Sequence, residues 1–366
     1  MGDHAPVSGP VPWKRADHTG AKHDIYRRYL ERWFPILLAG SNAYPSATYA
    51  EGFAGPGVYE GGEPGSPIIA IQALLDKVRD PIPVVKMIFV DDDLRCIDTL
   101  NKQLTLKFPT RPRSAETLRV KVKAGTCVER LEPELDAMQA WGQPILAVLD
   151  SWGNVPVTYR LLERLARNQS SEVIITLGTQ SFIRFVSKLG PEADEVFGGD
   201  PSWRQINTMA TGQAKRQHIL TCYRQTLARA GFKYLLDFEL IDTRGESLYL
   251  VFGTNHRRGL EKMKDSVWEV DRVYGVGFRD PRDEQAQTLF ELIDPVLAPL
   301  ARLLLNRLKT APPSGMRVEE LRNFALFETV YRPEHVIRTL ADLRADGRIS
   351  SDETRIFRRS MVRLAG

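Results

Sequence analysis

The sequence predicts an α/β fold, in which a mostly parallel, Rossmann-like sheet ends in an antiparallel hairpin and a small winged helix-turn-helix unit follows. Apolar runs alternate with segments of helical periodicity over residues 47–177, which is the rhythm of a doubly wound sheet. Residues 234–252 contain two apolar runs joined by a turn-rich link, which indicates a hairpin. Residues 316–366 show two helical patterns and then two short strand patterns, which is the order of a winged helix.

The elements of the sheet are bounded by turn residues or by a change of periodicity. Strands are expected at Ala47–Phe53, Val84–Val90, Leu118–Val122, Ile145–Leu149 and Val173–Leu177. Val84–Val90 is a nearly continuous apolar run, which suits a strand buried on both faces of a parallel sheet. The intervening helices are expected at Ser66–Val78, Leu94–Phe108, Val128–Trp141 and Thr158–Arg167. The two hairpin strands are expected at Tyr234–Ile241 and Ser247–Phe252.

Three further segments accompany this sheet. Residues 1–18 are rich in Pro, Gly and Ala and are expected to form a flexible tail. Over Lys22–Leu38, apolar and aromatic side chains recur at helical spacing, which predicts a helix with one apolar face. The insertion at 179–230 is expected to contain a loop around Phe197–Trp203, placed where it could cover a ligand cleft, and then a helix over Gln213–Ala230.

A long helix and a Pro-rich linker precede the C-terminal unit. They are expected at Gln285–Leu308 and Ala311–Gly315. The unit itself is expected to contain helices at Val318–Phe324 and Pro333–Ala345 and strands at Arg348–Ser350 and Arg355–Arg358. The predicted domains are therefore a sheet domain over 19–310 and a winged helix over 316–366.

Composition and cysteine usage restrict the class of protein. A chain of 366 residues with 43% hydrophobic and 26% charged residues can bury a sizeable core without disulfides. Its three cysteines, Cys96, Cys127 and Cys222, form no CxxC pair, so we expect buried thiols in a reducing compartment. No apolar run is long enough to span a membrane, and the first residues lack a signal-peptide core. A soluble, cytoplasmic protein without membrane contact is expected.

The net charge of +4 permits contact with nucleic acid without requiring it. From Met316 onward there are ten arginines against eight acids. The second helix of the C-terminal unit offers Arg332, His335, Arg338 and Arg344, and the wing offers Arg355, Arg358 and Arg359. Winged helices bind DNA through the second helix, but acidic residues interrupt this one. Binding of nucleic acid and docking of a protein both remain open interpretations.

Three common classes of site lack their signature. The sequence contains no Gly-x-x-x-x-Gly-Lys-Ser/Thr motif, which argues against a P-loop nucleotide hydrolase. It also contains no Gly-x-Ser-x-Gly elbow of a serine hydrolase. The six histidines show no metal-ligand spacing, so no metal site is expected.

The strongest motif is the glycine turn Glu51–Gly57, which follows the first predicted strand. Glycines permit positive φ and let a ligand approach the backbone closely. At the carboxyl end of a first strand, such a turn lies where a Rossmann-like sheet binds a nucleotide cofactor. We expect Phe53, Gly55 and Gly57 to contact the cofactor and the Glu51 carboxylate to hold an ammonium group. A parallel sheet that closes with an antiparallel hairpin favours the class I S-adenosylmethionine fold over an NAD-binding one.

Two further strand ends complete the expected cofactor site. Asp91 ends the second predicted strand, where a carboxylate can accept hydrogen bonds from both ribose hydroxyls. Asp92 and Asp93 compete for this role, and Asp93 equally fits the N-cap of the next helix. Gly125 and Thr126 follow the third strand and are expected to meet the adenine, although Thr126 also fits an N-cap.

The fourth strand ends in Asp150, Ser151, Trp152 and Gly153. In this fold the fourth strand end faces the reacting group. An acid can accept a proton or orient an amine, and an aromatic ring can stack on a flat substrate. Asp150 and Trp152 are therefore the candidate catalytic residues, with a helix cap and a core tryptophan as the structural alternatives.

Several of these motifs together resemble a bacterial family, the three-Cys-motif partner proteins (TcmP). The resemblance rests on Lys22-His23 at the start of an aromatic helix, on Tyr49–Tyr59 with the downstream Gly65-Ser66-Pro67, on Phe89-Val90-Asp91, on Gly253–Leu260 with Met263-Lys264, and on the winged-helix tail. It covers most of the chain. The family is similar to class I methyltransferases, and it is named for a radical-SAM-like companion that carries a three-cysteine motif. The resemblance therefore implies S-adenosylmethionine as cofactor and that companion as partner.

The Lys-His helix and the glycine turn also resemble a group of ribosomal RNA adenine methyltransferases. Those enzymes carry an Asp-Pro-Pro-aromatic signature after the fourth strand, whereas this chain has Asp150-Ser151-Trp152-Gly153. The missing prolines put methylation of a base amino group in doubt. Lys22, His23, Tyr59 and Arg257 are the expected substrate contacts. The structural alternatives are that Lys22-His23 forms the solvated first turn of a helix and that Arg257 is an ordinary charged residue at the start of another helix.

Two functions follow from these patterns. The first is an enzyme that transfers a methyl group to nucleic acid, DNA or RNA, presented by the C-terminal unit. The second is a non-catalytic scaffold for the radical-SAM-like companion, in which the winged helix docks protein or DNA.

Overall fold

The computed structural model describes residues 9–41, 43–78, 83–109, 117–151, 155–241, 247–274 and 297–365. Its centre is a seven-stranded sheet in the order β3-β2-β1-β4-β5-β7-β6. The strands are β1 (Ser46–Glu51), β2 (Val84–Asp91), β3 (Leu118–Ala124), β4 (Ile145–Leu149), β5 (Glu172–Leu177), β6 (Tyr234–Ile241) and β7 (Ser247–Thr254). The pairs among β1 to β5 are parallel, and β7 is antiparallel to both β5 and β6. The mixed sheet with a closing antiparallel hairpin is therefore confirmed.

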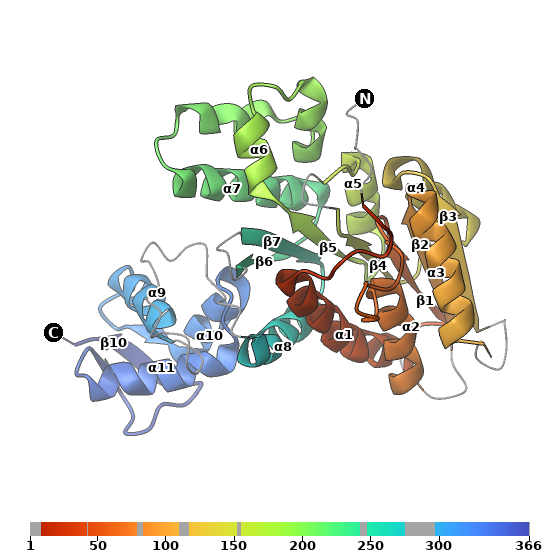
Figure 1. The fold of residues 1–366 in the computed structure, drawn as a ribbon. Helices are drawn as coiled ribbons and strands as arrows, with labels where there is room; N and C mark the ends of the chain where they lie inside the picture. Colours follow the sequence, from red (N-terminus) through yellow and green to blue (C-terminus); the bar gives the residue numbers. More distant parts are fainter. Residues whose placement is uncertain are drawn as a thin grey trace.

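Helices cover both faces of the sheet (Figure 1). One face packs against α1 (Asp17–Leu38), α2 (Ser66–Lys77), α3 (Leu94–Lys107) and α8 (Arg257–Tyr274). The other packs against α4 (Cys127–Ala137), α5 (Tyr159–Arg167) and α7 (Gly212–Ala230). Successive strand side chains point to opposite faces, so Tyr49 joins the first layer and Ala50 the second. All six residues of β1 are buried, which explains why its sequence lacks a polar face.

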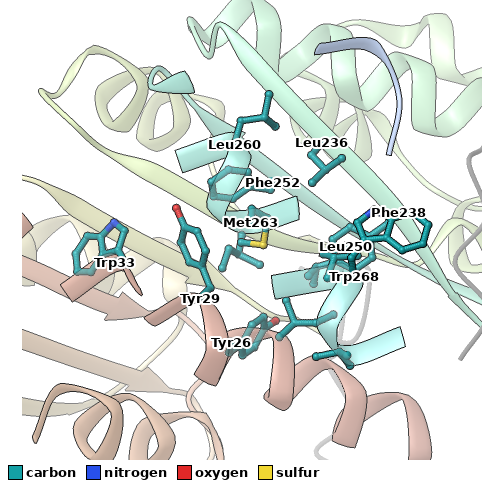
Figure 2. Close-up of a cluster of buried hydrophobic side chains, with 14 of the residues drawn as sticks. Tyr26, Tyr29, Trp33, Leu236, Phe238, Leu250, Phe252, Leu260, Met263 and Trp268 are labelled. Atoms are coloured by element: carbon teal, nitrogen blue, oxygen red, sulfur yellow. The ribbon is translucent and has the colours of Figure 1, made fainter. Parts of the chain in front are cut away.

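The aromatic face of α1 packs this helix against both α2 and α8 and onto the sheet. Figure 2 shows Tyr26, Tyr29 and Trp33 of α1 beside hairpin residues and residues of α8. The rings of Tyr29 and Phe252 meet edge to face with centroids 5.4 Å apart. Offset and edge-to-face ring pairs add to the free energy gained by burying apolar area. The helix thereby carries Lys22 and His23 to a fixed place against the sheet.

The insertion between β5 and α7 is more ordered than its sequence predicts. It contains α6 (Thr179–Phe185) and two 3₁₀ helices, η1 (Pro191–Phe197) and η2 (Pro201–Thr208). The stretch Phe197–Trp203, expected as a loop, turns between η1 and η2 at two glycines with positive φ. Phe197 and Trp203 are fully buried and stacked at 5.2 Å. Aromatic burial thus makes this stretch part of the core, which corrects the expectation of a loop.

The C-terminal unit is built around a small antiparallel sheet in the order β8-β10-β9. Its elements are α9 (Ala298–Lys309), β8 (Met316–Arg317), α10 (Val318–Glu328), α11 (Pro333–Ala345), β9 (Ile349–Ser351) and β10 (Met361–Leu364). Helix α9 packs against α11 and β10, so the unit begins before the predicted linker. The first part of the predicted helix Gln285–Leu308 lies outside the described residues.

The strand predicted at Arg355–Arg358 is wrong, because the second hairpin strand is β10 at Met361–Leu364. The Ser360 hydroxyl accepts a hydrogen bond from the Phe357 amide and donates one to Glu353, which closes a turn before the strand. Val362 is then fully buried and pairs with both Met316 and Ser351. Met361–Leu364 forms the strand because its apolar residues can be buried, whereas the arginines of Arg355–Arg358 stay in solvent.

A buried lysine of α8 joins the C-terminal unit to the sheet domain. Lys264 donates hydrogen bonds to the carbonyls of Ala325, Thr329 and Tyr331 at 2.7, 2.6 and 2.9 Å. These carbonyls lie at and beyond the end of α10, where the helix dipole favours a positive charge. The indole of Trp268 donates to Val330 at 2.8 Å. The unit is therefore fixed against α8, and Figure 1 shows α10 beside that helix.

Two general expectations can be checked in the described residues. Cys96, Cys127 and Cys222 are free and buried, as predicted. Among the described helices, none is long and apolar enough to cross a membrane.

Candidate functional site

The predicted cofactor residues meet at the carboxyl edge of the sheet. Strand β1 lies between β2 and β4, so the order of strands reverses there and leaves a crevice outside the strand ends. Glu51 ends β1 and Asp91 ends β2, while Gly125 follows β3 and Asp150 follows β4. Four segments distant in the sequence therefore converge on one edge, because parallel strands all end on the same side.

The three glycines of the turn after β1 serve different purposes. A Cβ on Gly52 would lie 2.5 Å from Cys127 Sγ, and one on Gly57 would lie 2.6 Å from Leu100 Cδ1. Both therefore allow close packing, and Gly57 also has a φ of +71°. Gly55 has a φ of +63°, but a Cβ there would meet nothing nearer than the Trp13 ring at 3.8 Å. Gly55 is thus the glycine of this turn whose missing side chain leaves room above the backbone.

Asp91 is bonded to the glycine turn. Its Oδ2 accepts the Gly55 amide at 2.7 Å and its Oδ1 accepts the Asp93 amide at 3.0 Å. Burial raises the pKa of Asp91, and these two backbone hydrogen bonds oppose the rise. Asp93 is the N-cap of α3 and accepts the Arg95 amide, as the alternative interpretation predicted, while Asp92 is exposed. Asp91 thus holds the Gly55 backbone in place, whatever else it binds.

Glu51 is sequestered below this edge. Its carboxyl accepts hydrogen bonds from the Tyr49 hydroxyl at 2.6 Å and from the Ser66 hydroxyl at 2.7 Å, and the residue is 1% exposed. Burial raises the pKa of Glu51 to about 8, even though both hydroxyl bonds favour the charged form. At neutral pH the group is therefore mostly protonated. A neutral acid holds an ammonium group less strongly than the carboxylate that the sequence suggests.

Asp150 lies at the centre of a buried polar cluster. Lys22 Nζ is 2.8 Å from Oδ1 and 2.6 Å from Oδ2. The Thr176 hydroxyl donates to Oδ1 at 2.6 Å and the Tyr26 hydroxyl to Oδ2 at 3.3 Å. Burial alone would raise the pKa of Asp150, but the Lys22 charge and these hydrogen bonds hold it below its ordinary value. Asp150 is therefore a carboxylate with donors on both oxygens, supplied by α1 and β5.

His23 stands beside this ion pair as a neutral ring. Burial and the neighbouring Lys22 charge lower the pKa of His23 to about 3. Its Nδ1 is buried and has no hydrogen-bond partner among the described residues, and its ring lies 5.5 Å from that of Tyr59. The predicted substrate contacts Lys22, His23 and Tyr59 are thus brought together next to Asp150. The resemblance to a known family, rather than spacing, was the signal that linked them.

The far side of the edge carries apolar side chains that sequence reasoning missed. Leu94, just after Asp93, is 66% exposed, and Val128, just after Cys127, is 49% exposed. Gly125, which follows β3, has a φ of +133°, and its amide donates to the Asp91 carbonyl at 3.0 Å. Thr126 caps α4 by accepting the Glu129 amide at 3.3 Å, as the alternative interpretation proposed. Two exposed aliphatic side chains at successive strand ends suit the faces of a flat ring.

Part of the predicted flexible tail crosses this edge. The Trp13 carbonyl accepts the Glu60 amide at 2.9 Å, and the Gly9 carbonyl accepts a hydrogen bond from Arg95 at 3.1 Å. Arg15 lies 3.7 Å from Glu63. Residues 9–16 therefore lie over the glycine turn, with the Trp13 ring above Gly55. Proline and glycine content in the sequence predicts weak local structure but cannot show such tertiary contacts.

The remaining predicted residues divide into three groups. Phe53 is half-buried beside the second core layer. Trp152 and Gly153 lie outside the described residues. Arg257 lies away from the others: it follows β7, whose last residue, Thr254, pairs with Glu172 at the beginning of β5. Because β7 is antiparallel, its end reaches the amino edge of the sheet, so Arg257 is on the opposite side from Asp150. The expectation that it contacts the same substrate is corrected accordingly.

Comparisons with known proteins add little to this geometry. No protein-family model matches the chain, and no curated protein matches it. Among solved structures, a possible exported protein from Bordetella parapertussis aligns with 15% identity over 64% of this chain and 66% of its own, at a TM-score of 0.30. EvdMO1 aligns with 13% identity over 79% of this chain and 60% of its own, at a TM-score of 0.31. The chain thus spans about two thirds or less of these structures.

Proposed function

We propose that the protein is an S-adenosylmethionine-dependent, methyltransferase-like protein that acts on nucleic acid together with a radical-SAM-like three-cysteine partner. The observation that carries the proposal is the convergence of Gly55, Asp91 and Asp150 on the point where the strand order reverses. The antiparallel β7 between β5 and β6 supports a class I methyltransferase sheet, in keeping with the family resemblance. We also propose that the chain is a member of the TcmP family and that its C-terminal unit is a winged helix.

The residues of the edge fit this cofactor. Among the described residues, only the Trp13 ring lies within 4 Å of a Cβ placed on Gly55, so a ligand would approach this backbone by stacking on that ring or displacing it. Asp91 still has lone pairs for hydroxyl donors, and Leu94 and Val128 offer apolar faces. A methyl group bound to sulfonium sulfur is the electrophile that the cofactor would supply. Lys22 and His23 would contribute a positive charge and a neutral acceptor, Nδ1, beside the acceptor substrate, while Tyr59 would supply an aromatic wall.

Binding of S-adenosylhomocysteine, measured by calorimetry, tests the cofactor. We expect wild-type protein to bind and Gly55→Val to lose at least tenfold in affinity, because the new side chain fills the space above the turn. Gly142→Val is the matched control: its φ is +81° and it lies before β4, at the opposite edge. Asp91→Ala should also weaken binding. No heat of binding in the wild type, or equal affinities in all four proteins, would reject the proposal.

One observation favours the second candidate, a non-catalytic adaptor. Both oxygens of Asp150 are occupied by Lys22, Thr176 and Tyr26, so this carboxylate positions α1 rather than standing free for an acceptor amine. An adaptor would keep this arrangement for its stability alone. Co-purification with the tagged partner and transfer of tritiated methyl groups to RNA or DNA separate the two. Association without transfer, together with full cellular function of the double variant Lys22→Met/Asp150→Asn, which leaves no charge buried, supports the adaptor.

A further inference from the structure

Positive charge is concentrated in the C-terminal unit. Residues 297–365 contain thirteen Lys and Arg against eight Asp and Glu, whereas the whole chain has a net charge of only +4. The rest of the chain therefore carries one more acid than base. A fold that separates charge in this way presents a positive field on one unit, which attracts polyanions.

The helix expected to read DNA does not present most of its basic residues. Arg332 lies 3.0 Å from Glu334 and 3.7 Å from Asp265 of α8. His335 is 6% exposed and packs edge-on against Trp268. Arg344 donates to the carbonyls of Glu353 and Thr354 at 3.0 and 2.6 Å, which holds the β9–β10 loop. The first half of α11 thus packs against α8 and cannot enter the groove of a nucleic acid.

A different surface of the unit is both hollow and basic. A groove of about 540 Å³ lies between α9 and the ends of β9 and β10. Its described lining residues are Arg302, Leu305, Asn306, Lys309, Arg348, Leu364 and Ala365, of which three are cations and none is a carboxylate. Lys309 Nζ is held 3.1 Å from Asn306 Oδ1. The cations come from two segments and border an apolar floor of two leucines.

We propose that this groove binds the phosphate backbone of a nucleic acid. Guanidinium groups bind phosphate through paired N–H donors, and a lysine adds a point charge. Charges from separate segments suit a ligand with regularly repeated phosphates, and the leucine floor suits the sugar faces between them. The choice of nucleic acid over an acidic protein rests on the proposed function, for which the groove would hold substrate beside the sheet domain.

Binding without cofactor tests this inference, so its failure is distinct from a failure of the proposed function. Anisotropy of fluorescein-labelled single-stranded RNA and duplex DNA is measured with full-length protein at about 50 to 200 mM salt. The variant R302Q/K309Q/R348Q should bind at least tenfold more weakly at the lowest salt. The slope of log K against log salt should shrink by about 3 for duplex or about 2 for a single strand.

The matched control removes the same charge elsewhere. Arg160 and Arg167 lie exposed on α5, and Lys188 lies exposed in the insertion. R160Q/R167Q/K188Q should keep wild-type affinity and slope. If the triple groove variant does not fold, R348Q alone, at an exposed position before β9, should reduce the slope by about 1. Equal losses in groove and control variants, no binding by the wild type, or tighter binding of polyglutamate than of either nucleic acid would overturn the inference.

Discussion

Lys22 Nζ lies 2.6 Å from Asp150 Oδ2, and this pair joins the first helix to the end of the fourth strand. The side chains are only 9% and 15% exposed, so the charges interact in a poorly solvated place. Breaking a buried pair by removing one partner is costly, because the other charge stays buried without compensation. The pair therefore fixes where α1 presents His23 to the carboxyl edge.

Removing Lys22 should destabilise the protein. Lys22→Met is expected to lower the free energy of unfolding by about 3–5 kcal/mol, measured by urea denaturation at neutral pH. Lys22→Met combined with Asp150→Asn should lose less than the single variant, since no charge is left buried. Arg167→Met is the control: it removes an exposed pair with Glu163 and should change stability by less than about 1 kcal/mol. A single variant as stable as this control would contradict the role of the pair.

The stability that the Lys22–Asp150 pair contributes should decrease at acidic pH. Because the pKa of Asp150 is lowered in the folded state, the contribution is present above the unfolded pKa of about 4 and is lost as the pH falls through the folded value. The difference in stability between wild type and Lys22→Met should therefore shrink below about pH 4. Denaturation curves at several acidic pH values check this, and a constant difference would count against it.

Glu51 should make the protein less stable as the pH rises. Its folded pKa of about 8 exceeds the ordinary value of 4.5, so the folded state holds a proton that the unfolded state has released. Stability then falls by about 1.4 kcal/mol per pH unit between the two values. Burial raises the pKa of Glu172 to about 7, so this group adds to the decrease in stability with rising pH up to that value. His23, whose pKa is lowered to about 3, makes stability increase with pH up to its ordinary pKa of 6.5. The clean window is therefore pH 7 to 8.

Within that window, Glu51→Gln should flatten the dependence, because a neutral amide replaces the protonated acid. Denaturation at the two ends of the window measures the difference. Glu172→Gln serves as the comparison and should leave most of the slope in place. A wild-type stability that is constant from pH 7 to 8 would show that Glu51 is already ionised.

The strap formed by residues 9–16 should report ligand binding. The Trp13 ring lies above Gly55, where the proposed cofactor approaches the backbone. Adding S-adenosylhomocysteine should change the tryptophan fluorescence, and Trp13→Phe should abolish most of that change. The five other tryptophans provide the unchanged background. An identical response in wild type and variant would place the ligand away from the strap.

Lys264 should hold the C-terminal unit against α8. Lys264→Met removes one donor from three carbonyls, of which that of Ala325 keeps the Thr329 hydroxyl at 2.8 Å. A buried carbonyl left unsatisfied costs about 1–3 kcal/mol. Hydrogen exchange should accelerate at the end of α10, from Ala325 to Tyr331. Lys262→Met on the same helix is the control, because the Lys262 ammonium pairs with Asp265 at 2.8 Å and donates to none of these carbonyls in the described part of the chain. Exchange that accelerates equally in both variants would argue against a specific anchor.

Much of the sheet could be predicted because its signal is local. Continuous apolar runs mark β2 and β4 to within a residue, and the Tyr234–Ile241 strand has the predicted bounds. The last strand of the C-terminal unit was misplaced by several residues, because the choice between Arg355–Arg358 and Met361–Leu364 depends on which segment can pair with Met316 and Ser351. Of these two partners, Met316 is distant in the sequence, and its pairing with β10 leaves no periodic pattern in the sequence.

The candidate site shows the same division. The sequence by itself determined that glycines and acids stand at successive strand ends, since strand and turn patterns are readable over a few residues. Only the tertiary structure decided what those groups do. Glu51 is buried and mostly neutral, Asp150 forms an ion pair with Lys22, and Arg257 is at the opposite edge of the sheet. Protonation and pairing depend on burial and on charges brought from far along the chain, and burial exists only once the chain has folded.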